Sequence, residues 1–70
     1  MKYVVMKQVG QKIKELRLQK EWTQTELGAK LKVNQSYIAR IEKGDHNVSV
    51  NLLEEISKAL GVKLVVDFSP

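Results

Sequence analysis

The sequence predicts an all-α fold, a small bundle of four helices, followed by a short C-terminal β-strand. Three observations predict it. Apolar residues recur at helical spacing in four segments, polar capping residues stand before three of these segments, and a two-residue alternation begins after Gly61. With 70 residues in total, residues 1–70 are expected to form one domain.

The first helix is expected over residues 7–20. Val9, Ile13 and Leu16 recur at helical spacing, with polar residues between them. Residues 1–5 are ambiguous, because the Tyr-Val-Val run within them suits either a short strand or a frayed arm.

The second helix is expected over residues 24–31, because a capping box precedes it. The Thr23 hydroxyl can accept from the backbone N–H of Glu26, whose carboxylate can reach back to the Thr23 N–H. Trp22 before the cap and Leu27 in the first turns form a hydrophobic staple across the same helix start.

The third helix is expected over residues 35–43 and begins in the same way. Asn34 is a strong N-cap residue, and Val33 before it can pack on Ile38 as a second staple. Gly44 is a natural residue for the end of this helix, because glycine readily adopts the left-handed conformation there.

The fourth helix is expected over residues 50–60, with Ser49 as its N-cap and Gly61 after its last residue. Its spacing predicts one buried face. The residues of that face are Leu53, Ile56 and Leu60.

A strand is expected over residues 62–68, because apolar side chains alternate with other residues there. The residues on its apolar face are Val62, Leu64, Val66 and Phe68. Since a single strand is not stable alone, it must pair either with residues 3–5 of the same chain or with its copy in a second chain. We therefore predict that these four side chains contribute to dimerisation.

The second and third helices together are expected to form a helix-turn-helix over residues 24–43. Only residues 32–34 separate the two short helices, and so short a connection forces them to cross steeply. Gly28 agrees with this arrangement, because glycine in a helix interior is tolerated where another backbone comes close.

Positive charge is concentrated in the part of the chain that holds this unit. Residues 1–43 carry ten Lys or Arg and four Glu, which gives +6, whereas residues 44–70 carry two Lys and four acidic residues, which gives −2. Such asymmetry points toward a polyanionic partner, either a nucleic acid or an anionic membrane surface, but by itself it equally suits ordinary solvated lysines.

Catalysis and metal binding are not expected. His46 is the only histidine, is expected in an exposed loop, and has no cysteine or second histidine with which to bind zinc. We therefore predict no enzyme activity, no cofactor and no metal. The absence of cysteine and of any apolar run near 18 residues favours a cytoplasmic protein with no membrane span.

The stretch TQTELGAKLKVNQSYIARIEKG, with IKELR before it and LLEEISKALGV after it, resembles the Cro and lambda-repressor-like helix-turn-helix family, also called XRE. The resemblance covers roughly residues 9–62. The matching positions are Leu16, Arg17, Thr23, Gln24, Leu27, Gly28, Val33, Ile38, Ile41, Glu42, Gly44, Leu60 and Gly61. One position departs, because the family usually has glycine in the turn where this chain has Lys32.

The resemblance implies that the third helix enters the major groove of DNA with its N-terminal end. Gln35 and Ser36 would then face base edges, and Gln35 has the amide that pairs with adenine. Arg40 could bind guanine or a phosphate, and Ala39 could touch a thymine methyl group.

The resemblance further implies that Gln24 contacts a phosphate and braces Gln35. Additional phosphate candidates are Asn34, Tyr37 and Lys43. Asn34 is also the helix cap, and Tyr37 could instead pack on the first helix. Arg17 and Glu42 look like the ion pair that joins the first and third helices in this family.

These features predict a homodimeric repressor of transcription that binds double-stranded DNA at an inverted-repeat operator. The alternative is an antitoxin that also binds a toxin protein and regulates its own operon. A basic helix lying on a membrane is less favoured, because the bundle already uses the apolar face of KIKELRLQK.

Overall fold

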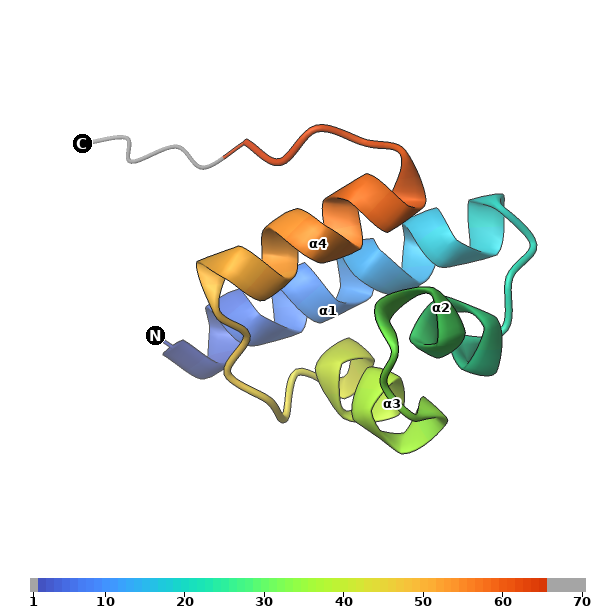
Figure 1. Ribbon diagram of the computed structural model, residues 1–70. Coiled ribbons are helices and arrows are strands. Elements are labelled where there is room, and N and C mark those ends of the chain that lie inside the picture. Colours follow the sequence, from blue (N-terminus) through green and yellow to red (C-terminus); the bar gives the residue numbers. More distant parts are fainter. Residues whose placement is uncertain (1, 66–70) are drawn as a thin grey trace.

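Four α-helices make up the fold in the computed structural model, which describes residues 2–65. They are α1 (Lys2–Gln19), α2 (Gln24–Leu31), α3 (Gln35–Lys43) and α4 (Val50–Leu60). Both α1 and α2 pack against α3 and α4, so that the four helices surround one core (Figure 1). The predicted all-α bundle is therefore confirmed.

Helix α1 begins earlier than expected. It runs from Lys2 rather than from residue 7, so residues 2–5 are the first turn of a helix and neither a strand nor a frayed arm. The physical reason is cooperativity, because each residue added to an existing helix gains one hydrogen bond without a new nucleation step. The helix ends at Gln19.

The other three helices have the expected bounds, and each begins at the predicted cap. Thr23 Oγ1 accepts from the Glu26 N–H at 3.0 Å, and the Thr23 N–H donates to the Glu26 carboxylate at 2.8 Å. Asn34 Oδ1 accepts from the Tyr37 N–H at 2.9 Å, and Ser49 Oγ accepts from the Leu52 N–H at 3.1 Å. Local hydrogen bonds that the sequence encodes thus set where these helices start.

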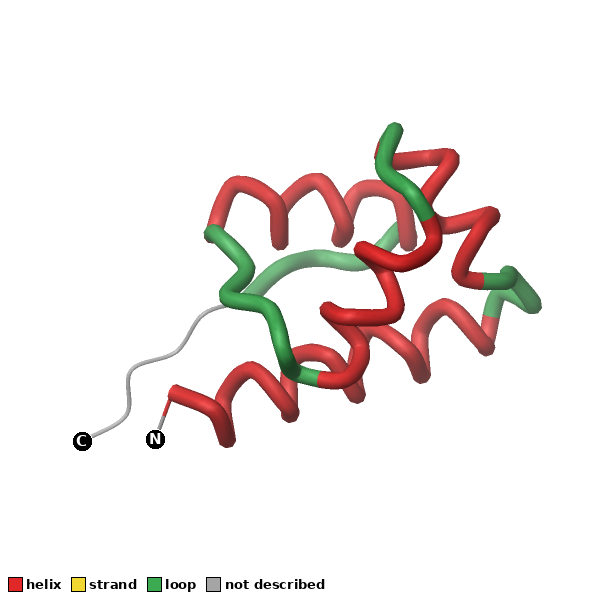
Figure 2. Tube along the Cα trace, turned by 90° about the horizontal axis from the view of Figure 1, so that it is seen from below, coloured by secondary structure: helices red, strands yellow, loops and turns green. Residues whose placement is uncertain are grey.

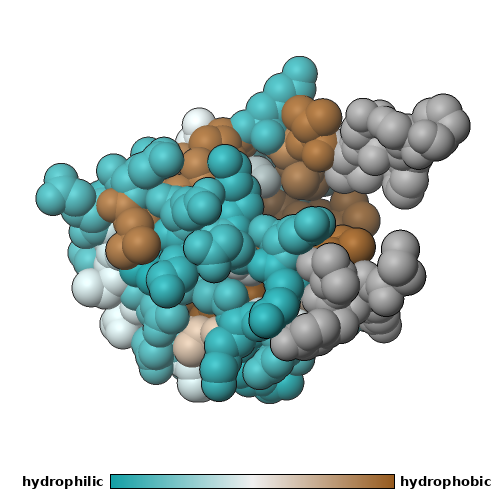
Figure 3. Space-filling model, turned by 180° about the vertical axis from the view of Figure 1, so that it is seen from behind, coloured by the Kyte–Doolittle hydropathy of each residue, from teal (hydrophilic) through white to brown (hydrophobic). Residues whose placement is uncertain are grey.

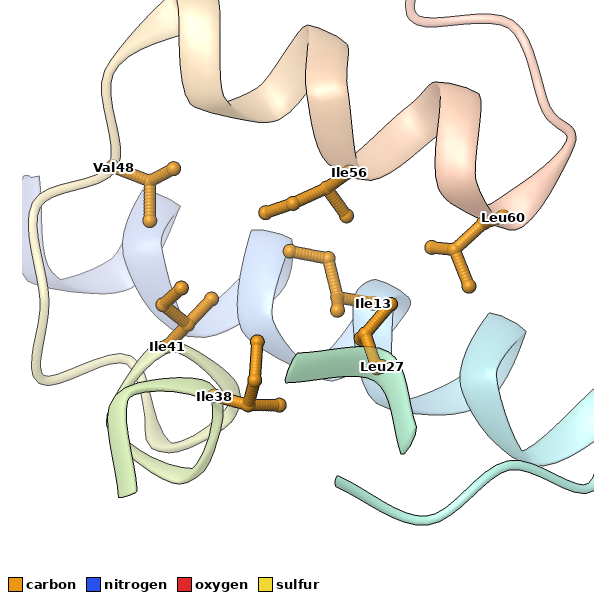
Figure 4. Packing of buried hydrophobic residues seen from close by; sticks show 7 residues of the cluster. All are labelled: Ile13, Leu27, Ile38, Ile41, Val48, Ile56 and Leu60. Carbon is orange, nitrogen blue, oxygen red and sulfur yellow. The ribbon is translucent and has the colours of Figure 1, made fainter. Parts of the chain in front are cut away.

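The core is formed by side chains from all four helices and from the loop before α4 (Figure 4). Its largest fully buried side chains come from α2, α3 and α4. The buried residues are Ile13, Leu27, Ile38, Ile41, Val48, Ile56 and Leu60. Trp22 packs against this core and is only partly buried.

Two glycines allow close backbone contacts that fix the position of α3. A Cβ on Gly28 would lie 2.7 Å from the Val33 carbonyl oxygen, so the turn into α3 passes directly over α2. A Cβ on Gly10 would lie 2.8 Å from the Glu42 carbonyl oxygen and still closer to that of Ile41. Helix α3 is therefore held between α2 and the N-terminal half of α1.

The expected C-terminal strand is not found in its described part. Residues 62–65 have no strand conformation, residues 66–68 lie outside the described part, and no segment of residues 2–65 is a strand (Figure 2). The intrachain partner expected at residues 3–5 is helical, which removes that possibility of pairing.

Residues 62–65 instead border an apolar hollow between α1 and α4. The hollow has a volume of about 430 Å³, and Val62, Leu64 and Val65 are among its lining residues. Val62 is 39% exposed and Val65 is 73% exposed. The other two residues of the predicted dimerisation set, Val66 and Phe68, lie outside the described residues.

The face opposite to the view of Figure 1 is largely hydrophilic, and its hydrophobic side chains gather mainly toward the upper right of the view (Figure 3). Within residues 2–65, no helix combines the length and the apolar character needed to cross a membrane.

Candidate nucleic-acid interface

Helices α2 and α3 form the predicted helix-turn-helix. The turn is closed by a hydrogen bond from the Val33 N–H to the Gly28 carbonyl at 2.9 Å. Lys32 has φ 60 and ψ 39, the left-handed conformation that glycine adopts most readily. Lysine therefore adopts the left-handed conformation at the position where the family that the sequence resembles usually has glycine.

Helix α3 separates a buried face from an outward face. Ile38 and Ile41 are 0% and 1% exposed and anchor the helix to the core. Gln35, Ser36 and Arg40 are exposed on the other side, with Ala39 half-buried between them and Lys43 exposed in the last turn. Burial of the two isoleucines thus fixes which residues of this helix a partner can reach.

A chain of hydrogen bonds connects the buried part of the protein to Gln35. Arg17 donates through Nε to Glu42 Oε2 at 2.7 Å and through Nη2 to Oε1 at 3.0 Å. Gln24 Nε2 donates to Glu42 Oε1 at 3.1 Å, and Gln35 Nε2 donates to Gln24 Oε1 at 2.5 Å. We call these four side chains the Arg17–Gln35 relay.

The ion pair at the start of the relay is almost completely removed from solvent. The Arg17 and Glu42 side chains are 8% and 3% exposed. The hydrogen bonds to Glu42 raise the pKa of Arg17, burial lowers it, and the Coulomb attraction of the carboxylate raises it again, with a net upward shift. Arg17 also donates to the Trp22 carbonyl at 2.6 Å, which ties the end of α1 to the start of α2.

Asn34 uses its side-chain oxygen for two hydrogen bonds at the start of α3. Asn34 Oδ1 accepts from the Tyr37 N–H as the helix cap and also accepts from the Ser36 hydroxyl at 2.8 Å. The cap therefore orients Ser36 as well, and the Ser36 oxygen keeps its lone pairs for another donor.

Tyr37 contacts a residue that the sequence placed in an exposed loop. His46 is half-buried, and its Nε2 lies 2.9 Å from the Tyr37 hydroxyl. The two ring centroids are 4.7 Å apart with an interplanar angle of 68°, an edge-on contact. The expectation of an exposed His46 was wrong, because the loop after α3 folds back onto the side of that helix.

Two residues near this surface were not among the predicted site residues. Gln11 and Lys14 of α1 line a hollow of about 330 Å³ together with Gln24, Ala39 and Lys43. Their spacing on the first helix gave no functional signal, because nothing local in the sequence tells which side of α1 meets α3.

The structure offers no group for holding a metal in its described part. Residues 2–65 contain no cluster of three or more histidine, aspartate or glutamate side chains able to bind an ion.

Two helices joined by a short turn, the second of which presents polar side chains to solvent, define a helix-turn-helix protein, and α2 and α3 have this arrangement. Comparison with known families agrees, because the helix-turn-helix family model matches residues 13–66. The chain belongs to this family, and the resemblance to the Cro and lambda-repressor-like branch is confirmed.

Similar proteins carry names of regulators. The control protein C.BamHI of Bacillus amyloliquefaciens is 43% identical over 63 residues, which is 86% of this chain and 78% of that protein. The immunity repressor protein of Bacillus phage phi105 is 39% identical over 56 residues, 80% of this chain and 39% of the repressor.

A solved structure has the same fold. The restriction-modification controller protein C.AhdI from Aeromonas hydrophila superposes with a TM-score of 0.82 at 30% identity. The match covers 87% of this chain and 88% of that one.

Proposed function

We propose that this protein is a sequence-specific DNA-binding regulator of transcription that represses by occupying an operator. Helix α3 would enter the major groove and read bases with its outward face. The observation that carries the proposal is the Arg17–Gln35 relay, because it gives the exposed Gln35 amide one defined orientation.

The direction of the relay follows from the chemistry of its buried end. The Glu42 carboxylate can only accept hydrogen bonds, so Gln24 must turn its NH₂ group toward it. The Gln24 carbonyl then faces Gln35, which must donate one N–H to it. Gln35 keeps one N–H and its carbonyl oxygen for a partner, and one donor beside one acceptor is the pattern that complements adenine N7 and N6.

Three neighbouring residues extend this reading surface. Ser36 can accept from a base, Ala39 can touch a thymine methyl group, and Arg40 carries the donors that suit guanine or a phosphate. All three lie on the outward face of α3.

Residues around this surface would hold the DNA backbone. Gln24 is the first residue of α2, where free N–H groups and the helix dipole favour a phosphate. Lys43 adds a cation in the last turn of α3. Asn34 and Tyr37 are the remaining phosphate candidates, although each already has an internal hydrogen bond.

We further propose a homodimer on an inverted repeat, with one domain of residues 1–70 on each half-site. One short helix reads few base pairs, and two-fold symmetry would place half-sites about 34–36 Å apart on one face of the duplex. The exposed apolar residues Val62 and Val65 support a second copy at the C-terminal segment. Strictly monomeric sedimentation at tens of micromolar protein would contradict this part.

The regulator is favoured over the antitoxin alternative. The similar proteins are a control protein, a repressor and a controller, and none of their names describes a toxin partner.

Selection from random duplex DNA, followed by binding to the enriched sequence and to a scrambled one, tests the function. We expect an inverted repeat and a preference of about 10³-fold or more over the scramble. Uniform binding that falls steeply with salt would show only a basic surface and would refute sequence-specific reading.

Gln35→Ala tests the residue on which the proposal rests. It should weaken operator binding by about 1–3 kcal/mol and leave binding to scrambled DNA almost unchanged. Gln19→Ala, which removes the same side chain at the exposed end of α1, is the matched control. An equal loss on both duplexes would mean that Gln35 does not read bases.

A further inference from the structure

We propose that α1 is part of the DNA-binding surface, and that Gln11 and Lys14 hold a backbone phosphate beside the base-reading helix. This inference rests on the proposed function. It adds a contact from outside the helix-turn-helix, and Gln11 also precedes residue 13, where the family match begins.

The geometry starts from a hollow between three helices. Its volume is about 330 Å³, and α1, α2 and α3 each contribute to its wall. The lining residues are Gln11, Lys14, Gln24, Ala39, Glu42 and Lys43. Since Ala39 belongs to the proposed reading surface and Gln24 is a proposed phosphate contact beside it, a DNA strand that follows α3 along the groove passes this hollow.

Gln11 and Lys14 lie on one side of α1. Residues three apart in a helix are neighbours on its surface, so the amide and the ammonium group can act on the same ligand. A second hollow of about 470 Å³ adjoins the first and shares Gln11, Glu42 and Lys43 with it. The two hollows therefore lie next to each other along the junction between α1 and α3.

The charge of the hollow suits an anion. Lys14 and Lys43 are exposed, and within residues 2–65 neither of them forms an ion pair. Glu42 is the one acidic residue in the lining, but its side chain is only 3% exposed and its carboxylate is already bound by Arg17. The hollow thus presents two lysine side chains and neutral donors, and the negative charge of Glu42 is neutralised by Arg17.

The available groups favour a phosphate over a base. Lys14 offers a charge without the planar fork that reads guanine, and Gln11 adds amide N–H donors. Contacts of this kind position a protein on the duplex and carry no sequence information. They therefore predict an effect on DNA binding that differs from that of Gln35.

Lys14→Ala in the full chain tests the inference, and Lys58→Ala is the matched control. Both substitutions remove one exposed positive charge from a helix. Lys58 lines a different hollow, which contains no residue of α3. Affinity is measured on the operator and on scrambled DNA between about 50 and 200 mM salt, a range over which phosphate contacts strongly affect binding.

We expect Lys14→Ala to weaken binding to both duplexes by the same factor and to lower the slope of log affinity against log salt by about one. Over a fourfold change in salt, the ratio of wild-type to variant affinity should shrink about 3.5-fold. Lys14→Arg should keep the wild-type slope, and Gln11→Ala should weaken both duplexes equally with little change in slope.

The inference is overturned if Lys14→Ala and Lys58→Ala have the same affinities and slopes. It is also overturned if Lys14→Ala loses affinity only on the operator, because Lys14 would then read sequence. A wild-type chain without sequence preference refutes the proposed function alone, and the slope of Lys14→Ala still decides the role of α1. A wild-type chain that binds no DNA refutes both.

Discussion

Removing the Glu42 carboxylate should cost this protein a large share of its stability. In Glu42→Ala the guanidinium of Arg17 stays in a site where the side chain is only 8% exposed, yet it loses both bonds to its partner. It keeps only the bond to the Trp22 carbonyl. A buried charge without its counterion is therefore left behind, which is the costly way to break an ion pair.

The magnitude follows from the two hydrogen bonds that join Arg17 to Glu42, at 2.7 and 3.0 Å. Each hydrogen bond to a charged group contributes about 1.5–3 kcal/mol. Breaking one partner of a buried pair costs about 3–5 kcal/mol in known cases. Since small domains have about 0.05–0.15 kcal/mol of stability per residue, a chain of 70 residues is expected to have a free energy of unfolding of about 3.5–10.5 kcal/mol, and this loss is a large share of it.

Urea unfolding measures this effect, with fluorescence of the single tryptophan and far-ultraviolet circular dichroism as two probes. With a slope near about 1 kcal/mol per molar urea, the midpoint should fall by about 3 M or the folded baseline should disappear. Glu15→Ala is the matched control, because its partner Lys12 is 3.9 Å away and the two side chains are 51% and 67% exposed. It should change stability by less than about 1 kcal/mol.

A second variant separates the buried charge from simple loss of packing. The double substitution Arg17→Met with Glu42→Leu removes both charges and fills the site with apolar atoms, so most of the stability should return. If Glu42→Ala lost no more than Glu15→Ala, the ion pair would not be the stabilising connection between α1 and α3 that its burial indicates.

Three other substitutions test separate features. Lys32→Gly should raise the free energy of unfolding by about 1 kcal/mol, because φ is 60 there and a Cβ is disfavoured in that conformation; a lower melting temperature would contradict this. Gly10→Ala should destabilise by about 1–3 kcal/mol, since the new methyl group collides with backbone carbonyls of α3; equal or greater stability would show that α1 can move away. The hydrogen bonds from Thr23 lower the pKa of Glu26 in the folded protein. The ionised carboxylate therefore stabilises the fold at any pH above the ordinary pKa of glutamate, and this stabilisation is lost as the pH falls through the lowered pKa of the folded state. Melting of wild type and Glu26→Gln should therefore differ at neutral pH and converge in acid, and a gap independent of pH would contradict the role of the charge.

Features encoded by neighbouring residues could be predicted from the sequence. Thr23, Asn34 and Ser49 start their helices by hydrogen bonds that span three residues, so the local pattern contains all the necessary information. The left-handed glycines Gly44 and Gly61 end two of these helices for an equally local reason.

Features that depend on distant partners could not be predicted in the same way. The first residues of α1 were ambiguous because their composition also suits a strand. They are helical because they extend an existing helix. Position 10 requires a residue without a side chain because backbone carbonyls more than thirty positions away lie against it. The strand expected at residues 62–68 depended on a partner, and the one available within the chain is helical.

The candidate site was accessible to sequence reasoning only through family resemblance. Arg17 and Glu42 are 25 positions apart, and no periodicity connects them. Once the fold brings them together, elementary hydrogen-bond chemistry orients Gln24 and Gln35 without reference to any relative. The position of Gln11 and Lys14 beside α3 could not be predicted, because it depends on how α1 and α3 pack together.

The Arg17–Gln35 relay has a consequence for engineering this protein toward new operators. A substitution at Gln35 alone removes the N–H group that donates to the Gln24 carbonyl. Gln24 then keeps only its hydrogen bond to Glu42. In libraries that vary residue 35 by itself, the side chain of Gln24 has therefore lost one of its two hydrogen bonds. If Gln35 reads bases as proposed, varying residues 24 and 35 together lets each new side chain at position 35 be selected along with a residue that supports it, and we expect altered specificity to arise from such pairs.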